Sequence, residues 1–189
     1  WNGSTKVFLA MAKYLEDKIN LEADTKLGDV RVILVVEDSV KYYSRYLPLL
    51  YTEIMSQTQA IIAEESSNDE MDVILRMRVR PKLILVSNFD DAVGIINKYR
   101  NNIIGVISDV RYAHNGVKDE DAGVSLIKYV QQLDFIFRDR NGKVIDRAPN
   151  IEEFRQKLMT IPDESLEYHA IRNGISTWLM ARAEINLAK

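Results

Sequence analysis

The sequence predicts an α/β fold, a doubly wound parallel sheet with helices on both faces. Three short apolar runs, VRVILVV (30–36), KLILV (82–86) and NIIGVIS (102–108), alternate with segments of helical spacing. Short runs that are rich in β-branched residues and lack polar alternation are typical of strands buried on both faces. A strand–helix–strand–helix–strand order with right-handed crossovers then produces a parallel sheet.

A helix is expected before the first strand. Apolar residues recur at helical spacing over 7–19, and Ser4 belongs to the residue types that cap helix N-termini. The polar stretch at 20–29 is expected to end this helix. Residues 1–28 are therefore predicted to form an N-terminal linker helix.

The first crossover is predicted to be one long helix, from Ser39 to about Glu65. About 26 residues at a rise of 1.5 Å each span roughly 39 Å, more than a small domain needs to cover its sheet. Pro48 is expected to kink this helix or to lie in its early turns. The excess length favours a helix that projects or packs against a partner, and a homodimer through it is one expectation.

Two further helices are predicted between the strands. A helical piece is expected over 71–79. It is expected to end there because the residue before Pro81 disfavours helical geometry. Residues 89–100 have the spacing of an amphipathic helix, with Asn88 or Asp90 as its cap.

The third strand is followed by a predicted polar loop at 110–121 and a helix at 122–132. The buried side of that helix is expected to consist of Val124, Leu126, Ile127 and Val130. Residues 29–132 are therefore predicted to form the α/β core.

The α/β pattern ends at Gln132. Strands are predicted at 135–138 and 143–147, because they flank Asn141-Gly142, a strong short-range hairpin signal. Helices at 151–159 and 163–188 complete a C-terminal extension over 133–189, and Gly174 interrupts the second of them.

The composition excludes several classes of function. The formal net charge of -3 and the pI of about 5.5 give no electrostatic case for nucleic acid. The absence of cysteine excludes disulfides, thiol catalysis and thiolate metal sites. No apolar run approaches the roughly 18–20 residues of a membrane-spanning helix. A chain that opens on Trp1 without a signal-peptide pattern is expected to be a piece of a longer cytoplasmic polypeptide.

Carboxylates follow two of the strands at the point where each strand ends. Glu37 and Asp38 follow the first strand, and Asp109 follows the third. If these strands are neighbours, as in a flavodoxin-like order, the three carboxylates converge on one crevice. Converging carboxylates raise one another's pKa unless a cation is present, and Mg²⁺ suits oxygen ligands. The alternative is that each acid only caps the helix after its strand.

The segments VVEDS (35–39) and VISDV (106–110) resemble the acidic pair and the phosphoacceptor strand of response-regulator receiver domains. The resemblance implies a flavodoxin-like fold and a two-component phosphorelay, in which Asp109 accepts a phosphoryl group from a histidine kinase or phosphotransfer protein. It also implies that Glu37, Asp38 and Asp109 hold Mg²⁺, Glu37 through water, and that Arg111 adds its backbone carbonyl. No enzymatic activity is implied beyond the gain and loss of the module's own phosphoryl group.

Two features depart from the receiver pattern. The interval between Asp38 and Asp109 is long, and no fourth strand ending in Ser or Thr, or fifth ending in Lys, follows Gln132. Either the fold is truncated or the sequence omits a segment there, and an otherwise uncovered sheet edge favours the omission. The switch hydroxyl and the phosphate-binding lysine cannot be assigned.

Weaker similarities extend beyond the core. Residues 1–10, 80–92 and 162–184 resemble segments of large bacterial proteins related to phosphoenolpyruvate synthase, which implies that residues 1–21 end a preceding domain. The long helix from Ser39 to about Glu65 and the missing strands leave a second function open. In this alternative the chain is a degenerate receiver that acts as a binding or dimerisation module. An aspartyl phosphohydrolase is disfavoured, because such enzymes carry a second acid where this chain has Arg111.

Three other groups have structural interpretations that outweigh functional ones. The basic cluster of Arg76, Arg78 and Arg80 is more typical of a solvated or internally paired surface than of a binding site. His114 is expected in an exposed loop. His169 is expected to pack half-buried on its helix.

Overall fold

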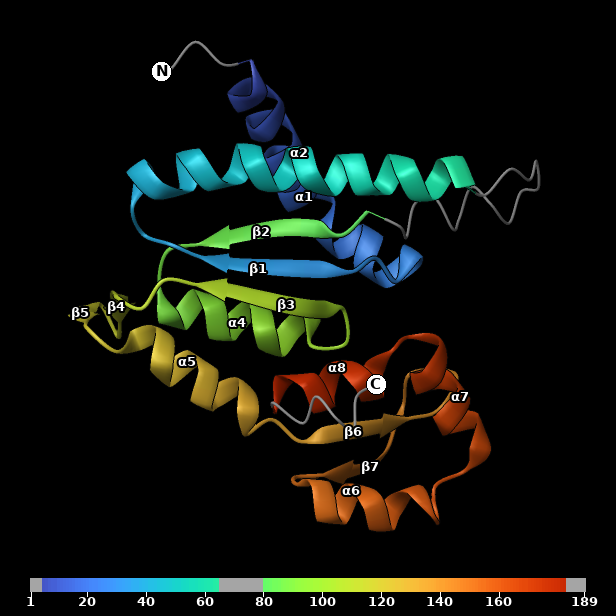
Figure 1. The fold of residues 1–189 in the computed structure, drawn as a ribbon. Helices are drawn as coiled ribbons and strands as arrows, with labels where there is room; N and C mark the ends of the chain where they lie inside the picture. Colours follow the sequence, from blue (N-terminus) through green and yellow to red (C-terminus); the bar gives the residue numbers. More distant parts are fainter. Residues whose placement is uncertain (1–4, 65–79, 183–189) are drawn as a thin grey trace. The chain divides into compact units, whose positions relative to one another are not determined.

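The computed structural model describes residues 5–64 and 80–182. The chain divides into two compact units, residues 1–123 and 124–189 (Figure 1). The predicted helix at 71–79 lies outside the described residues, as do Arg76 and Arg78.

The first unit contains a parallel sheet of three strands, β1 (Val32–Val36), β2 (Lys82–Val86) and β3 (Ile103–Ser108), in the order β2-β1-β3. Val32 pairs with Lys82 on one side and with Ile103 on the other. The predicted α/β fold is therefore confirmed. Among the described residues, no fourth or fifth strand joins this sheet.

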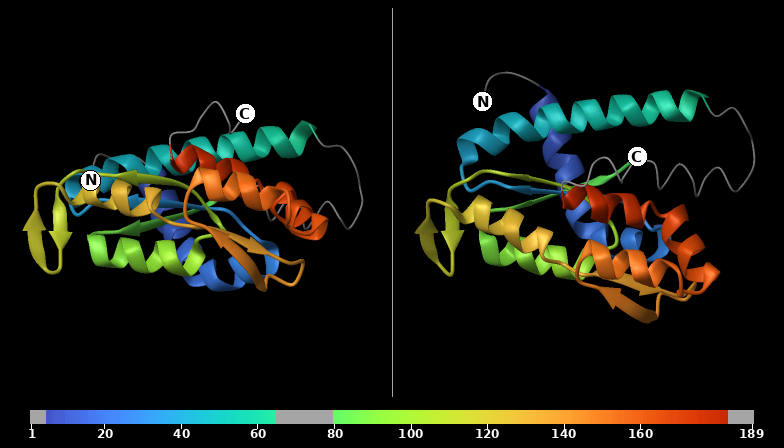
Figure 2. Two further views of the ribbon diagram at one scale, coloured as in Figure 1. Left: turned by 90° about the horizontal axis from the view of Figure 1, so that it is seen from below. Right: turned by 60° about the horizontal axis from the view of Figure 1, so that its bottom comes forward.

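Helices lie on both sides of the sheet. α2 (Val40–Glu64) and α4 (Phe89–Tyr99) lie on opposite sides of it in Figures 1 and 2. The predicted length of α2 is confirmed, with Pro48 inside the helix. Asn88 caps α4 by accepting a hydrogen bond from the Asp91 N–H. One core cluster joins the N-terminal helix α1 (Lys6–Gly28) to α2, β1 and β2 through Ala10, Leu47, Tyr51, Val35 and Leu83.

α1 (Lys6–Gly28) is longer than the sequence predicts, so the expected helix end near Ile19 is wrong. Its buried residues recur at helical spacing along the whole length: Ala10, Asp17, Leu21 and Thr25. The polar stretch at 20–29 predicted the end of the helix. A helix that packs only one face on a core, however, needs apolar or buried residues only at this spacing.

β3 is not buried on both faces, which corrects a second prediction. Ile104 and Ile107 are 45% and 46% exposed, because β3 is an edge strand of the described sheet. In the helix that follows, α5 (Ala122–Gln131), Leu126 is buried as predicted, but Val124 and Ile127 are exposed.

The predicted loop at 110–121 contains a hairpin. β4 (Tyr112–His114) pairs antiparallel with β5 (Val117–Asp119). The turn residues Asn115 and Gly116 have φ angles of 51° and 75°, and positive φ at both positions is characteristic of a type I′ turn.

The second unit contains the predicted hairpin, β6 (Phe135–Arg138) with β7 (Val144–Ala148), followed by α6 (Ile151–Leu158), α7 (Asp163–Ile171) and α8 (Gly174–Ala181). The predicted interruption of the last helix at Gly174 is confirmed, since Asn173 has a φ of 52° and separates α7 from α8, which begins at Gly174.

His169 packs in the aromatic core of this unit and is more deeply buried than predicted. Its Nε2 accepts a hydrogen bond from the Arg138 N–H at 3.0 Å. Burial, together with the charges of Arg138 and Arg172, lowers the pKa of His169 to about 4. These contacts support its structural interpretation.

Candidate functional site

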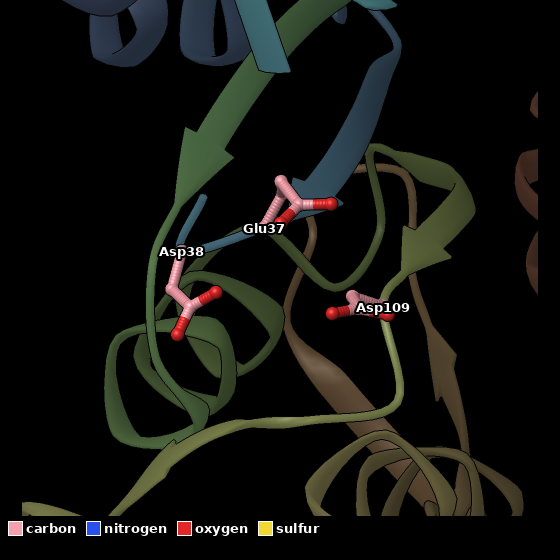
Figure 3. Close-up of side chains that lie close together, drawn as sticks. All are labelled: Glu37, Asp38 and Asp109. Carbon is pink, nitrogen blue, oxygen red and sulfur yellow. The ribbon is translucent and has the colours of Figure 1, made fainter. Parts of the chain in front are cut away.

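The three carboxylates singled out in the sequence meet at the carboxyl edge of the sheet. Glu37 and Asp38 lie between β1 and α2, and Asp109 directly follows β3. The two strands are hydrogen-bonded neighbours, so their ends lie side by side. One carboxylate oxygen from each residue lies within 4.8 Å of the others. Figure 3 shows the three side chains close together.

The backbone hydrogen bonds between the strands extend to Glu37 and Asp109. The Glu37 N–H donates to the Val86 carbonyl at 3.0 Å, and the Asp109 N–H donates to the Val36 carbonyl at 2.9 Å. The sheet therefore fixes the backbone of both residues through these hydrogen bonds.

The electrostatics of the cluster are unfavourable without a counter-charge. Glu37 is only 5% exposed, and Asp38 and Asp109 are exposed. Burial raises the pKa of Glu37, and the charges of Asp109 and Asp38 raise it further, against a hydrogen bond from the Ser39 N–H. Within the described ranges, no lysine or arginine forms an ion pair with these three acids.

The helix-cap interpretation does not account for Asp109. The next helix, α5, begins only at Ala122, and the β4–β5 hairpin lies between them. Asp109 therefore ends its strand without capping a helix, which leaves the converging carboxylates as the better explanation of the pattern.

The chemistry of the donor set suits a hard cation. All three side chains offer oxygen, the ligand atom that Mg²⁺ prefers, and their spacing lets one ion reach them all, directly or through water. A cation would also offset the repulsion around the buried Glu37.

Gly123 is a site residue whose role the sequence did not reveal. Its N–H donates to the Val110 carbonyl at 2.9 Å, and a Cβ added to it would overlap the carbonyl oxygen of Asp109. The start of α5 thus packs directly on the backbone of the predicted phosphoacceptor. A glycine near a helix start was visible in the sequence, but this contact depends on the tertiary fold.

Tyr112 is the second such residue. Its side chain is completely buried, and its hydroxyl lies 2.9 Å from Ser108 Oγ. Burial raises the pKa of Tyr112, and the nearby charges of Asp109 and Asp119 raise it further. No signal in the sequence distinguishes this tyrosine from the polar segment around it.

Arg111 projects its side chain to the surface, where it pairs with Glu120 at 3.3 Å. Its predicted role as a carbonyl ligand remains a prediction. Arg80 pairs with the buried Asp17, in agreement with an internally paired role.

His114 lies in β4 of the hairpin that follows Asp109 and is partly buried, so the expectation of an exposed loop is wrong. Its Nδ1 lies 3.2 Å from Asp119 Oδ2, and its ring packs on Phe89 at a centroid distance of 4.0 Å. The Asn115 N–H donates to Asp90 Oδ2 at 2.9 Å. These contacts anchor the hairpin to the start of α4, so His114 has a structural role.

No protein-family model matches the chain, and comparison with curated proteins and with solved structures finds no significant match. None of the helices in the described part of the chain has both the length and the apolar character to cross a bilayer. The geometry of the acidic cluster therefore carries the functional argument.

Proposed function

We propose that this chain is a receiver-type phosphoacceptor module, in which Asp109 accepts a phosphoryl group with the help of Mg²⁺. The observation that carries the proposal is the convergence of Glu37, Asp38 and Asp109 at the carboxyl ends of two adjacent parallel strands. The strand order β2-β1-β3 agrees with the first three positions of a flavodoxin-like sheet, 2-1-3-4-5.

Each acid has a role in this proposal. Asp38 and Asp109 would hold Mg²⁺ through carboxylate oxygens, Glu37 would hold it through water, and Arg111 would add its carbonyl oxygen. When bound, the ion neutralises charge on the transferred phosphoryl oxygens. A carboxylate oxygen of Asp109 forms the new bond to phosphorus while the bond to the donor's imidazole nitrogen breaks. The donor is a histidine kinase or a phosphotransfer protein.

A second candidate function is a degenerate receiver that serves as a binding or dimerisation module. Two observations favour it. The described sheet lacks the strands that would carry a switch hydroxyl and a lysine, and α2 exposes Tyr42, Tyr46 and Leu49 at helical spacing on one face. A homodimer through α2 would cover that apolar face.

Mass spectrometry after incubation with acetyl phosphate and Mg²⁺ separates the two functions. The phosphoacceptor proposal expects the mass of one added phosphoryl group, lost in Asp109→Asn and reduced in Asp38→Asn. Asp121→Asn is the matched control, since Asp121 is an exposed acid close in sequence but outside the cluster. An unchanged mass, or modification that persists in Asp109→Asn, contradicts the proposal.

A further inference from the structure

One side chain shortly after Asp109 is completely buried. Val110 and Arg111 are exposed, whereas Tyr112 is completely buried. A buried phenol hydroxyl needs a hydrogen-bond partner, because leaving it without one costs free energy. The partner of Tyr112 is the hydroxyl of Ser108, the last residue of β3.

The direction of these hydrogen bonds follows from counting protons. Ser108 Oγ carries one proton and donates it to the carbonyl oxygen of Asp109 at 2.7 Å. Tyr112 must therefore donate to Ser108 Oγ. The result is a chain of two hydrogen bonds that runs from the buried phenol to the backbone of Asp109.

Other contacts hold the residues at both ends of these two hydrogen bonds in place. The Asp109 N–H is bonded to Val36 in β1, and the Gly123 N–H is bonded to the Val110 carbonyl. Tyr112 begins β4, whose hairpin is anchored to α4 through Asn115 and Asp90. The backbone of Asp109 is thus fixed from the sheet, from α5 and, through Tyr112, from the hairpin.

We propose that Tyr112 and Ser108 are positioning residues for the phosphoacceptor site. Their hydrogen-bond chain fixes the backbone at 109–111, so that the Asp109 carboxylate stays within one cation's reach of Glu37 and Asp38. This inference rests on the proposed function, because it names what holds that same site in place. It also assigns a purpose to the β4–β5 hairpin, which contains Tyr112 and is anchored to the start of α4.

The expected effect is on metal affinity and on the rate of phosphoryl acceptance. Groups that orient metal ligands from the next layer typically change affinity by about 10–100-fold when they are removed. We expect Tyr112→Phe to weaken Mg²⁺ binding about 10-fold while the protein remains folded, since the ring is kept. Ser108→Ala should have a similar effect, and Ser108→Thr, which keeps the hydroxyl, should restore affinity.

Tyr51→Phe is the matched control. Tyr51 is also completely buried, and its hydroxyl donates to Asp17 at 3.0 Å between α1, α2 and β2. Tyr51→Phe should have a lower unfolding temperature than the wild type but the same Mg²⁺ affinity and the same phosphorylation rate. A merely structural role for Tyr112 predicts the same behaviour for both tyrosines.

The experiment combines calorimetric Mg²⁺ titration with NMR hydrogen exchange on the metal-free protein. The amide protons of Asp109 and Gly123 report on the loop, because both are hydrogen-bonded there. We expect them to exchange faster in Tyr112→Phe than in the wild type or Tyr51→Phe. Equal exchange rates overturn the positioning role, whatever the function of the site.

The two proposals fail in different ways. If the wild type binds Mg²⁺ and Tyr112→Phe binds it equally well, the positioning role is wrong and the proposed function stands. If the wild type neither binds Mg²⁺ nor accepts a phosphoryl group, the proposed function is wrong, and the exchange rates alone decide the positioning role.

Discussion

Two buried carboxylates in the first unit, Asp17 and Glu37, differ in how their charge is balanced. Asp17 in α1 is completely buried and accepts hydrogen bonds from the Tyr51 hydroxyl, the Leu83 N–H and the Arg80 guanidinium. Lys82 lies 3.4 Å from the same carboxylate. Glu37 is almost as buried, but its neighbours are two further acids.

The difference indicates different roles. The counter-charges of Asp17 come from this chain, from Arg80 and Lys82. We therefore interpret Asp17 as a structural residue that ties α1 to β2. Around Glu37, Asp38 and Asp109 the described residues supply no such cation, so the missing charge must come from outside the chain if the acids remain ionised together. The following predictions test this contrast.

The largest effect is expected at Asp17. Asp17→Ala removes the buried acceptor that Arg80 and Lys82 share, although Lys82 keeps its ion pair with Asp24. Removing one partner of a buried ion pair typically costs about 3–5 kcal/mol. Urea unfolding should show this loss. Glu16→Ala, which breaks only the exposed pair with Lys13, should cost less than about 1 kcal/mol. Equal losses in the two variants contradict a structural role for Asp17.

Gly123→Ala tests the packing on the acidic cluster. The added methyl group overlaps the Asp109 carbonyl oxygen, and such overpacking costs about 1–3 kcal/mol. Mg²⁺ affinity should fall as well, since the Asp109 backbone must move. Gly94→Ala is the control, because its Cβ has open space within α4 and should stabilise the protein by about 0.5–1 kcal/mol. An unchanged Mg²⁺ affinity in Gly123→Ala would falsify the dependence of the cation site on the position of the Asp109 backbone.

Asp109→Asn should stabilise the metal-free protein. The substitution removes one of three repelling charges without changing size, and stabilising changes of this kind contribute about 0.5–2 kcal/mol. Thermal unfolding in EDTA should show an increase of a few degrees, and Mg²⁺ should no longer add stability. A lower unfolding temperature in EDTA would mean that the cluster is already balanced within the chain.

A smaller effect is expected from pH. The folded pKa of Glu37 is raised above its ordinary value of 4.5, so its contribution to stability is fully present below pH 4.5 and is lost as the pH rises through the folded pKa. Glu37→Gln keeps the neutral form at every pH. The unfolding temperature of Glu37→Gln relative to the wild type should therefore increase with pH in EDTA, and a difference independent of pH contradicts the assigned repulsion.

Much of the core was predictable because it depends on local patterns. The strands at Val32–Val36 and Lys82–Val86 follow from continuous apolar runs, and the convergence of Glu37, Asp38 and Asp109 follows from parallel strands that end at one edge. The hairpin at Asn141-Gly142 was predicted from its turn residues and the strands that flank them.

The remaining features depend on tertiary contacts. Asn115-Gly116 carries the same turn signal, but the short strands around it lack an apolar alternation, so the hairpin was missed. The exposure of Ile104 and Ile107 reflects the number of strands in the described sheet, which their own sequence does not encode. The packing of Gly123 on Asp109 and the hydrogen bond of Tyr112 join residues that no local pattern connects.

Calorimetric titration of Mg²⁺ into the wild type and Asp38→Asn at neutral pH tests the central claim most directly. The account predicts one Mg²⁺ bound per chain in the wild type and a large loss of affinity in Asp38→Asn. Absence of binding in the wild type, or equal binding in Asp38→Asn, would contradict the claim that Glu37, Asp38 and Asp109 form a cation site.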